Sequence, residues 1–145
     1  MEIRELRPDD IHACVNLLIE TYNPPPWNNQ WTAETAGRYL ADFLAQPSFI
    51  GFVAVEASEL VAAMFAHRKT WWTNDELFVD ELFVKPEWQR QGYGKALLGR
   101  AEALSQASGW GGVTLLTNKY QPSKQFYEKN GYLVAEHVIF MYKES

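Results

Sequence analysis

The chain has 145 residues, of which 47% are hydrophobic and 21% charged, and its 13 Lys and Arg against 18 Asp and Glu give a net charge of −5. This length suits one domain, residues 1–145, with a core of its own. The lone Cys14 excludes an internal disulfide, and the acidic balance argues against nucleic-acid binding. No apolar run reaches the roughly 18 residues of a membrane span. The start, Met1 to Glu5, lacks the pattern of a signal peptide, so a cytoplasmic location without membrane partners is expected.

Hydrophobic periodicity predicts a mixed α/β chain. Apolar runs of strand length and apolar stripes at helical spacing follow one another along the sequence. In chain order, the expected elements are a strand at 2–7, helices at 10–21 and 32–46, strands at 49–56, 60–68 and 76–84, a helix whose apolar stripe runs from Leu97 to Ser105, a strand at 113–117, a helix at 121–129, and strands at 132–136 and 138–143. This order predicts an α/β fold with one dominant mixed sheet of about six to seven strands and about four helices.

The strand expected at 76–84 contains the sequence Glu-Leu-Phe-Val twice, at 76–79 and again at 81–84. An offset of five is odd, so the two copies are expected to face opposite sides of the sheet. By the same alternation, Asp80 and Glu81 point to opposite faces unless a β-bulge intervenes.

The segment after this strand has the composition of an anion-binding turn. It reads Gln-Arg-Gln-Gly-Tyr-Gly at 89–94 and leads into a helix. Backbone N–H groups at a helix start bind anions, glycine allows close approach, and Arg90 and Lys95 add positive charge. No Gly-Lys-Ser/Thr follows, and Leu97 stands where a third glycine would be, so a P-loop and a Rossmann site both fit poorly.

Two motifs in this order resemble the GNAT N-acetyltransferase family. The stretch 79–98 resembles the family's acyl-CoA-binding motif Gln/Arg-x-x-Gly-x-Gly/Ala, matched by Gln89, Gly92 and Gly94. The stretch 123–132 resembles the family's Ala-x-x-x-Tyr-x-x-x-Gly-Phe element. The resemblance covers about residues 76–135 and implies an acetyl-CoA-dependent N-acetyltransferase whose sheet splays between the fourth and fifth strands.

The resemblance also implies contacts to coenzyme A. The pyrophosphate would rest on backbone N–H groups of Gln89, Arg90, Gln91, Gly92, Tyr93, Gly94, Lys95 and Ala96. The pantetheine arm would lie along the strand edge at Leu82, Phe83 and Val84. Tyr127 takes the place of the family's tyrosine general acid, and Asn118 and Ser123 are further cofactor contacts. Tyr120 stands where the family often has asparagine, so the usual asparagine contact is displaced to Asn118.

Acetylation of an amine requires a proton acceptor. An amine with a pKa near 10.4 must lose a proton at neutral pH, which costs about 4.6 kcal/mol. Asp80 or Glu81, both on the strand beside the thioester, can accept that proton. Glu81 has the longer reach, whereas Asp80 shares a face with Leu82 and Val84, so both remain candidates. A backbone N–H of the same strand would hold the developing oxyanion, and the amine would attack directly without a covalent enzyme intermediate.

Aromatic residues make up 14% of the chain, including six Trp. Four of these, with two neighbouring carboxylates, are candidates for binding a small cationic acceptor through cation–π contacts and ion pairing. These candidates are Trp27, Trp31, Trp71, Trp72, Asp75 and Glu76. A hydrophobic rim or a homodimer surface explains the tryptophans equally well. His12, His67 and His137 lack metal-ligand spacing, so no metal is expected.

Two other functions remain open at this point. A coenzyme A-binding module for regulation or assembly, without acetyl transfer, would use the same motifs. A phosphate-binding domain for another nucleotide would use the glycine-rich turn alone. The first hypothesis stays an N-acetyltransferase acting on a small-molecule amine.

Overall fold

A computed structural model describes residues 1–145 as one five-stranded sheet flanked by helices. The strands, in spatial as well as chain order, are β1 (Glu2–Glu5), β2 (Phe49–Glu56), β3 (Glu59–Lys69), β4 (Glu76–Val84) and β5 (Val113–Leu115). The first four are antiparallel neighbours, and β5 lies parallel to β4. The helices are α1 (Ile11–Tyr22), α2 (Ala33–Leu44), α3 (Tyr93–Ala107) and α4 (Ser123–Lys129). The predicted mixed α/β class with four helices is confirmed.

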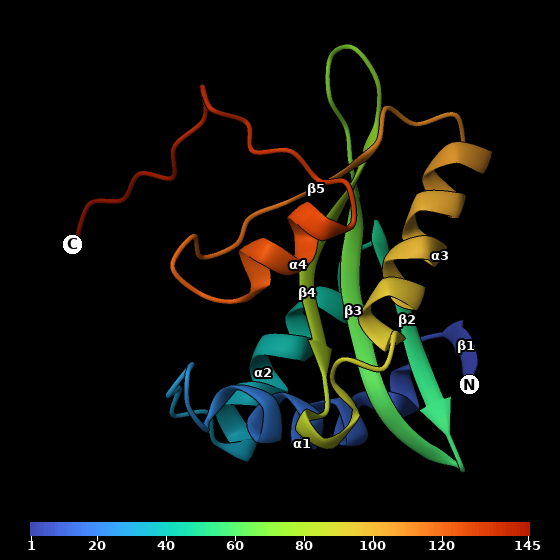
Figure 1. The fold of residues 1–145 in the computed structure, drawn as a ribbon, viewed down its shortest axis with the longest axis vertical. Coiled ribbons are helices and arrows are strands. Elements are labelled where there is room, and N and C mark those ends of the chain that lie inside the picture. The colour runs from blue at the N-terminus through green and yellow to red at the C-terminus, as the bar shows by residue number, and fades with distance from the viewer.

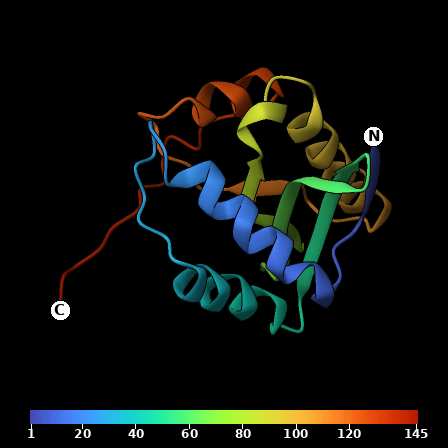
Figure 2. The same cartoon turned by 90° about the horizontal axis from the view of Figure 1, so that it is seen from below.

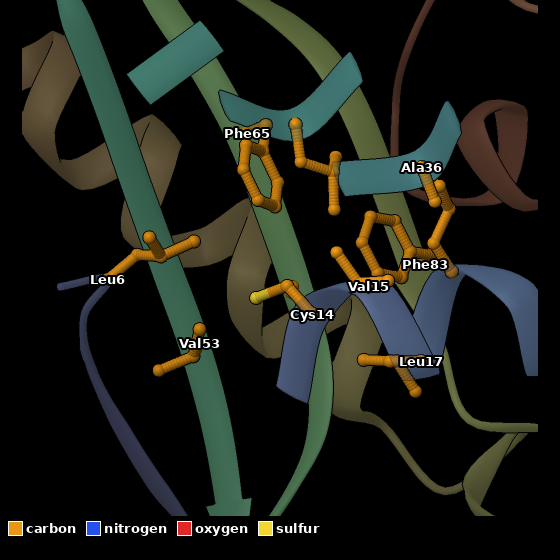
Figure 3. Packing of buried hydrophobic residues seen from close by; sticks show 11 residues of the cluster. Leu6, Cys14, Val15, Leu17, Ala36, Val53, Phe65 and Phe83 are labelled. Carbon is orange, nitrogen blue, oxygen red and sulfur yellow. The ribbon is translucent and has the colours of Figure 1, made fainter. Parts of the chain in front are cut away.

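Helices cover both faces of the sheet (Figures 1 and 2). On one face, α1 and α2 pack on the strands, and Cys14 and Val15 reach toward Phe65 and Phe83 (Figure 3). On the other face, α3 packs a second apolar cluster around Met64 and Leu77 through its apolar stripe. Burial raises the pKa of the Cys14 thiol to about 12, so this cysteine is a small core residue. No helix is long and apolar enough to cross a bilayer.

Local chemistry explains where α2 begins. The Thr32 hydroxyl accepts a hydrogen bond from the Thr35 N–H at 3.1 Å, and the Thr35 hydroxyl accepts one from the Thr32 N–H at 2.9 Å. This reciprocal pair satisfies donors that a helix start leaves free. The helix start that the sequence predicts at residue 32 is confirmed.

A β-bulge interrupts β4 at Asp80. Glu81 pairs with Phe65 of β3, Val79 pairs with Ala66, and Asp80 has no partner between them. Because the bulge adds one residue, the alternation of side chains between the two faces is shifted by one position beyond it. Both copies of Glu-Leu-Phe-Val therefore present the same residue types to the same faces, and the expectation that they face opposite sides is wrong.

The bulge lies where β4 separates from β5. The parallel pairing runs only from Leu77 with Val113 to Val79 with Leu115. Residues 81–84 stay paired with β3 but have no strand on their other edge. The sheet therefore opens between its fourth and fifth strands, as the family resemblance implied.

The two expected C-terminal strands are wrong. Residues 132–136 and 138–143 form no ladder, so the sheet has five strands instead of six to seven. The chain leaves the body on the side of β5 and extends away from it (Figures 1 and 2). β5 is the last strand of the sheet, and this segment forms no ladder with its open edge.

Candidate active site

A cavity of about 690 Å³ occupies the opening between β4 and β5. Its walls come from the C-terminal half of β4, the start of α3, the end of α1, the proline-rich loop, the residues after β5, and α4. Segments far apart in the sequence therefore meet at one place (Figure 1). This gathering makes the opening in the sheet the candidate active site.

One end of the cavity is formed by the start of α3. The first hydrogen bond of this turn runs from the Ala96 N–H to the Gly92 carbonyl at 3.0 Å. The N–H groups of Tyr93, Gly94 and Lys95 precede it and have no acceptor within the helix. Free donors, the positive end of the helix dipole and the exposed cations Arg90 and Lys95 fit a phosphate of coenzyme A.

The glycines of this turn have different physical roles. Gly92 has a φ of 91°, a left-handed conformation in which any other L-residue is strained. A Cβ on Gly94 would lie 3.0 Å from the Phe126 ring of α4. Gly94 therefore lets α4 approach α3 closely, a packing role that its motif spacing does not reveal.

The free edge of β4 offers backbone groups to the cavity. The Leu82 carbonyl accepts a hydrogen bond from the Tyr22 hydroxyl at 3.3 Å, and the Val84 carbonyl accepts one from the Gln89 side chain at 3.0 Å. Both carbonyls thus point away from β3, and the N–H of each residue points the same way. Phe83, between them, points into the core with α1. The edge can donate N–H groups to an extended amide chain, as pantetheine requires.

Both candidate bases face α2, although they are consecutive. The bulge turns Asp80 toward His67, whose Nδ1 lies 2.7 Å from Asp80 Oδ2. Glu81 Oε2 accepts a hydrogen bond from the Tyr39 hydroxyl at 2.5 Å. Asp80 therefore does not share a face with Leu82 and Val84, which pack on the α3 side.

Burial raises the pKa of both carboxyls above its ordinary value. For Glu81, hydrogen bonds from Tyr39 and Tyr22 partly oppose this effect and the nearby Asp80 charge adds to it. For Asp80, the hydrogen bond and charge of His67 oppose it. A raised carboxyl pKa strengthens the base, as proton abstraction from an amine requires.

Tyr127 lies close to Glu81, on α4. Burial raises the pKa of its hydroxyl, and the Glu81 charge raises it further. Its ring contacts Phe126 and Tyr132, edge to face, with centroids 5.2 and 5.7 Å away. Tyr127 therefore keeps its proton at neutral pH, and it lines the same cavity as Glu81.

Two of the four tryptophans border the cavity. Trp27 packs edge-on against Tyr22 with centroids 5.3 Å apart, and Trp31 stacks on Tyr39 at 4.9 Å. The Asn23 side chain holds Trp31 in place, since its amide donates to the Trp31 carbonyl and its oxygen accepts from the Trp31 N–H. The two rings form an aromatic wall beside Glu81.

The other four acceptor candidates lie elsewhere. Trp71 and Trp72 are 52% and 85% exposed on the loop between β3 and β4, the far end of the hairpin (Figure 1). Asp75 pairs with Arg68, and Glu76 accepts a hydrogen bond from Thr114. At about 3.3 Å per residue, Asp75 lies roughly 20 Å along β4 from Glu81. The structure does not bring these four residues to the cavity.

Several of the remaining cofactor candidates already use their polar groups in hydrogen bonds within the chain. Asn118 and Ser123 line the cavity, but Asn118 accepts from the Tyr120 N–H and Ser123 bonds the Thr117 hydroxyl at 2.7 Å. The Gln91 side chain turns back to the Glu87 carbonyl. The N–H of Ala96 is already bonded, as is that of Gln89, which donates to Pro86.

Three residues of the site were not predicted from the sequence: Tyr22, Tyr39 and His67. Tyr22 and Tyr39 reach β4 from α1 and α2, whereas His67 lies on the neighbouring strand β3. Only knowledge of the bulge would have placed Asp80 beside His67, and nothing in the local sequence marks a bulge at this position.

Comparison with known proteins identifies the class of this fold and site. A family model described as the acetyltransferase (GNAT) domain matches residues 47–134. Because this match spans more than half of the chain, the protein belongs to the GNAT acetyltransferases, enzymes that use acetyl-CoA. The resemblance found in the two motifs is confirmed.

Solved structures with the same fold share little sequence with this chain. A possible acetyltransferase from Clostridium difficile 630 has a TM-score of 0.83 at 18% identity, covering 99% of this chain and 97% of that one. Aminoglycoside acetyltransferase meta-AAC0020, from an uncultured soil metagenomic sample and in complex with sisomicin, has a TM-score of 0.78 at 20% identity, covering 99% and 95%. Aminoglycoside N-acetyltransferase AAC(6')-Iy, in complex with CoA, has a TM-score of 0.78 at 16% identity, covering 99% and 95%. No curated protein matches the sequence.

Proposed function

We propose that this protein transfers the acetyl group of acetyl-CoA to a primary amine of a small cationic molecule by direct attack. The observation that carries this proposal is the placement of Glu81 and Tyr127 in one cavity at the free edge of β4. Acetyl-CoA supplies the thioester. The chain supplies a proton acceptor, a proton-holding hydroxyl and backbone donors around the place where the thioester would lie.

We assign the base to Glu81. Of the two carboxylates, Glu81 is the one whose charge raises the pKa of Tyr127, and both residues line the cavity. Asp80 is engaged by His67 and influences Glu81 through its charge. Glu81 thus accepts the amine proton, while Asp80 is a positioning residue that helps keep the proton affinity of Glu81 high.

Tyr127 acts as a hydrogen-bond donor to the leaving sulfur. A thiol has an ordinary pKa near 8.5, below that of tyrosine, so full proton transfer to the thiolate runs against the pKa order. A donated hydrogen bond to developing negative charge does not require transfer. The raised pKa of Tyr127 keeps that donor present. The Leu82 N–H, on the free edge of β4, is the donor for the developing oxyanion.

Charge and aromatic surface favour a cationic acceptor. Asp80 and Glu81 supply negative charge on one wall, and Trp27 and Trp31 supply ring surface on the next. Aromatic faces and carboxylates together attract ammonium groups. Two structural neighbours, named as aminoglycoside acetyltransferases, act on molecules of this class.

A thiol-release assay with acetyl-CoA and a panel of amines tests the proposal. The panel contains aminoglycosides, a linear polyamine, a lysine-bearing peptide and a neutral amino sugar. We expect turnover with small polycations and much slower release with the neutral amine. Tight coenzyme A binding without turnover on any amine would instead indicate a coenzyme A-binding module. Stabilisation by ATP or NAD but not by coenzyme A would overturn the cofactor assignment.

A further inference from the structure

The free edge of β4 has its outward carbonyls already occupied by side chains. The Leu82 carbonyl accepts from the Tyr22 hydroxyl at 3.3 Å, and the Val84 carbonyl accepts from the Gln89 side chain at 3.0 Å. An extended amide chain laid along a strand edge offers N–H groups as well as carbonyls, so it pairs with both kinds of backbone group. To pair fully with Leu82, the arm of the cofactor therefore has to replace the Tyr22 hydroxyl.

The Tyr22 hydroxyl has a second acceptor beside the first. The Glu81 carboxylate, one residue before Leu82, is close enough to accept its hydrogen as well. A phenol carries one hydrogen, so it donates to one acceptor at a time. Burial raises the pKa of Tyr22, and the Glu81 charge raises it further, so this hydrogen stays on the oxygen at neutral pH. When one acceptor is taken, the hydroxyl can therefore donate to the other.

The ring of Tyr22 is held between two other rings. Tyr22 is the last residue of α1, and it packs edge to face against Trp27 at 5.3 Å and Phe83 at 6.1 Å between centroids. Phe83 belongs to the core, and Trp27 lines the cavity. A ring packed on two sides keeps its oxygen beside Leu82 and Glu81, so a change of acceptor requires only that the hydroxyl hydrogen turns.

We propose that Tyr22 is a positioning residue that couples occupation of the β4 edge by acetyl-CoA to the protonation of Glu81. With the edge empty, the Tyr22 hydroxyl donates to the Leu82 carbonyl. With that carbonyl taken by the cofactor arm, the hydroxyl donates to the Glu81 carboxylate, and Glu81 releases its proton to the solvent. The inference rests on the proposed function for the role of Glu81 as the base, since a base must be unprotonated before it can accept the proton of the amine.

Titratable groups from four elements influence Glu81. They are Tyr22 of α1, Tyr39 of α2, Asp80 of β4 with its partner His67 of β3, and Tyr127 of α4. Of these groups, Tyr22 is the one that also donates to a carbonyl of the free edge. The link between the cofactor site and the base therefore runs through Tyr22.

The size of the coupling follows from the strength of a charged hydrogen bond. A hydrogen bond donated to an ionised carboxylate favours the ionised form by about tenfold or more in the proton dissociation constant. A tenfold change releases at most about 0.5 proton per bound cofactor. By reciprocity, the affinity for acetyl-CoA should rise by up to about tenfold as the pH increases through the titration of Glu81.

The number of protons released on binding is the first test. Calorimetry between pH 5 and 8, in buffers of different ionisation enthalpy, counts these protons when acetyl-CoA binds without any amine. At its maximum, we expect the wild-type protein to release about 0.5 proton more than the Glu81→Gln protein. Protons from the phosphates of the cofactor appear in both counts and cancel in the difference. An equal or smaller count in the wild type overturns the proposal, and this comparison needs no variant of Tyr22.

Variants of the two tyrosines assign the coupling to Tyr22. Tyr22→Phe keeps the ring and should lose the extra 0.5 proton, roughly, but should change nothing in the Glu81→Gln background. Tyr39→Phe is the matched control, because Tyr39 donates to the same carboxylate and to no edge carbonyl, and it should retain the release. Circular dichroism verifies that each variant is folded.

Three results would overturn the assignment. They are a wild-type count in Tyr22→Phe, a loss that persists in the Glu81→Gln background, and an equal loss in Tyr39→Phe. Because the measurement contains no amine, a failure of the proposed acetyl transfer appears separately, as the absence of thiol release on the amine panel.

Discussion

Replacement of Glu81 by glutamine tests the assignment of the base. The amide keeps the size of the side chain and keeps an oxygen that can accept a hydrogen bond from Tyr39. In the structure, the Tyr39 hydroxyl donates this bond to Glu81 at 2.5 Å. The cavity shape is therefore retained, and only the ability to accept a proton is lost. Asp80→Asn is the matched control, because it removes the neighbouring carboxylate that the structure pairs with His67.

The expected loss follows from the acceptor chemistry. An amine with a pKa near 10.4 is neutral in about one molecule in 2,500 at pH 7. If Glu81 is the proton acceptor, the Glu81→Gln protein can acetylate only that neutral fraction of the amine. The loss in kcat/KM is therefore at most about 2,500-fold. Loss of a general base commonly costs about 10²–10⁴-fold. We therefore expect about 10²–10³-fold at pH 7, and less than about tenfold for Asp80→Asn.

The pH dependence of this loss is the decisive measurement. The neutral fraction of the amine rises about tenfold per pH unit below its pKa, so the deficit of Glu81→Gln should shrink by about tenfold per unit from pH 7 to pH 9. Thiol release at subsaturating amine gives kcat/KM directly. A deficit that is constant over this range, or an equal deficit in Asp80→Asn, would refute the assignment.

Four further changes test the other parts of the site and of the turn before α3. Tyr127→Phe removes a hydrogen bond to developing charge and should lower kcat about 10–100-fold, with coenzyme A affinity by calorimetry unchanged. Gly94→Ala places a Cβ 3.0 Å from a ring of α4 and should lower kcat/KM in the thiol assay. Gly92→Ala meets no atom within 4 Å but strains a φ of 91°, so thermal unfolding should show a melting temperature lower by about 3–8 °C. Tyr39→Phe removes a donor that holds down the pKa of Glu81, so the acidic limb of the kcat/KM profile should move to higher pH.

Each of these expectations has an outcome that contradicts it, and for Gly92→Ala that outcome is an unchanged melting temperature. An unchanged kcat for Tyr127→Phe removes the hydroxyl from the reaction. A Gly94→Ala protein with normal kcat/KM shows that the contact between α3 and α4 does not influence the site. An acidic limb that stays in place or moves down in Tyr39→Phe means that the limb reports a group other than Glu81.

The parts of the site that the sequence predicted are those that depend on local chemistry. The turn before α3 was recognisable because Gly92 has to be glycine and because a strand and a helix flank it. The same holds for the start of α2 near residue 32, where local chemistry fixes the helix end. The order of elements along the chain was enough to predict one mixed α/β sheet, since adjacent elements usually pack together.

The parts that escaped prediction depend on distant partners. Asp80 and Glu81 could not be assigned to a face, because the bulge exists only in the pairing of β4 with β3. Tyr39 lies 42 residues before Glu81 in the chain, and no periodicity links the two. The segments 132–136 and 138–143 have strand composition, but composition does not determine whether a segment pairs with an edge, and neither segment forms a ladder with β5.

The bulge in β4 has a consequence for insertions and deletions. Because Asp80 is the unpaired residue, a deletion of Asp80 leaves Val79 opposite Ala66 and Glu81 opposite Phe65, and every other side chain keeps its face. A deletion of Val79 or Leu82 can keep the register only if Asp80 leaves the bulge and takes a paired place, which moves Asp80 or Glu81 to the other face of the sheet. The loss of Asp80 itself leaves every remaining side chain of this strand on its face.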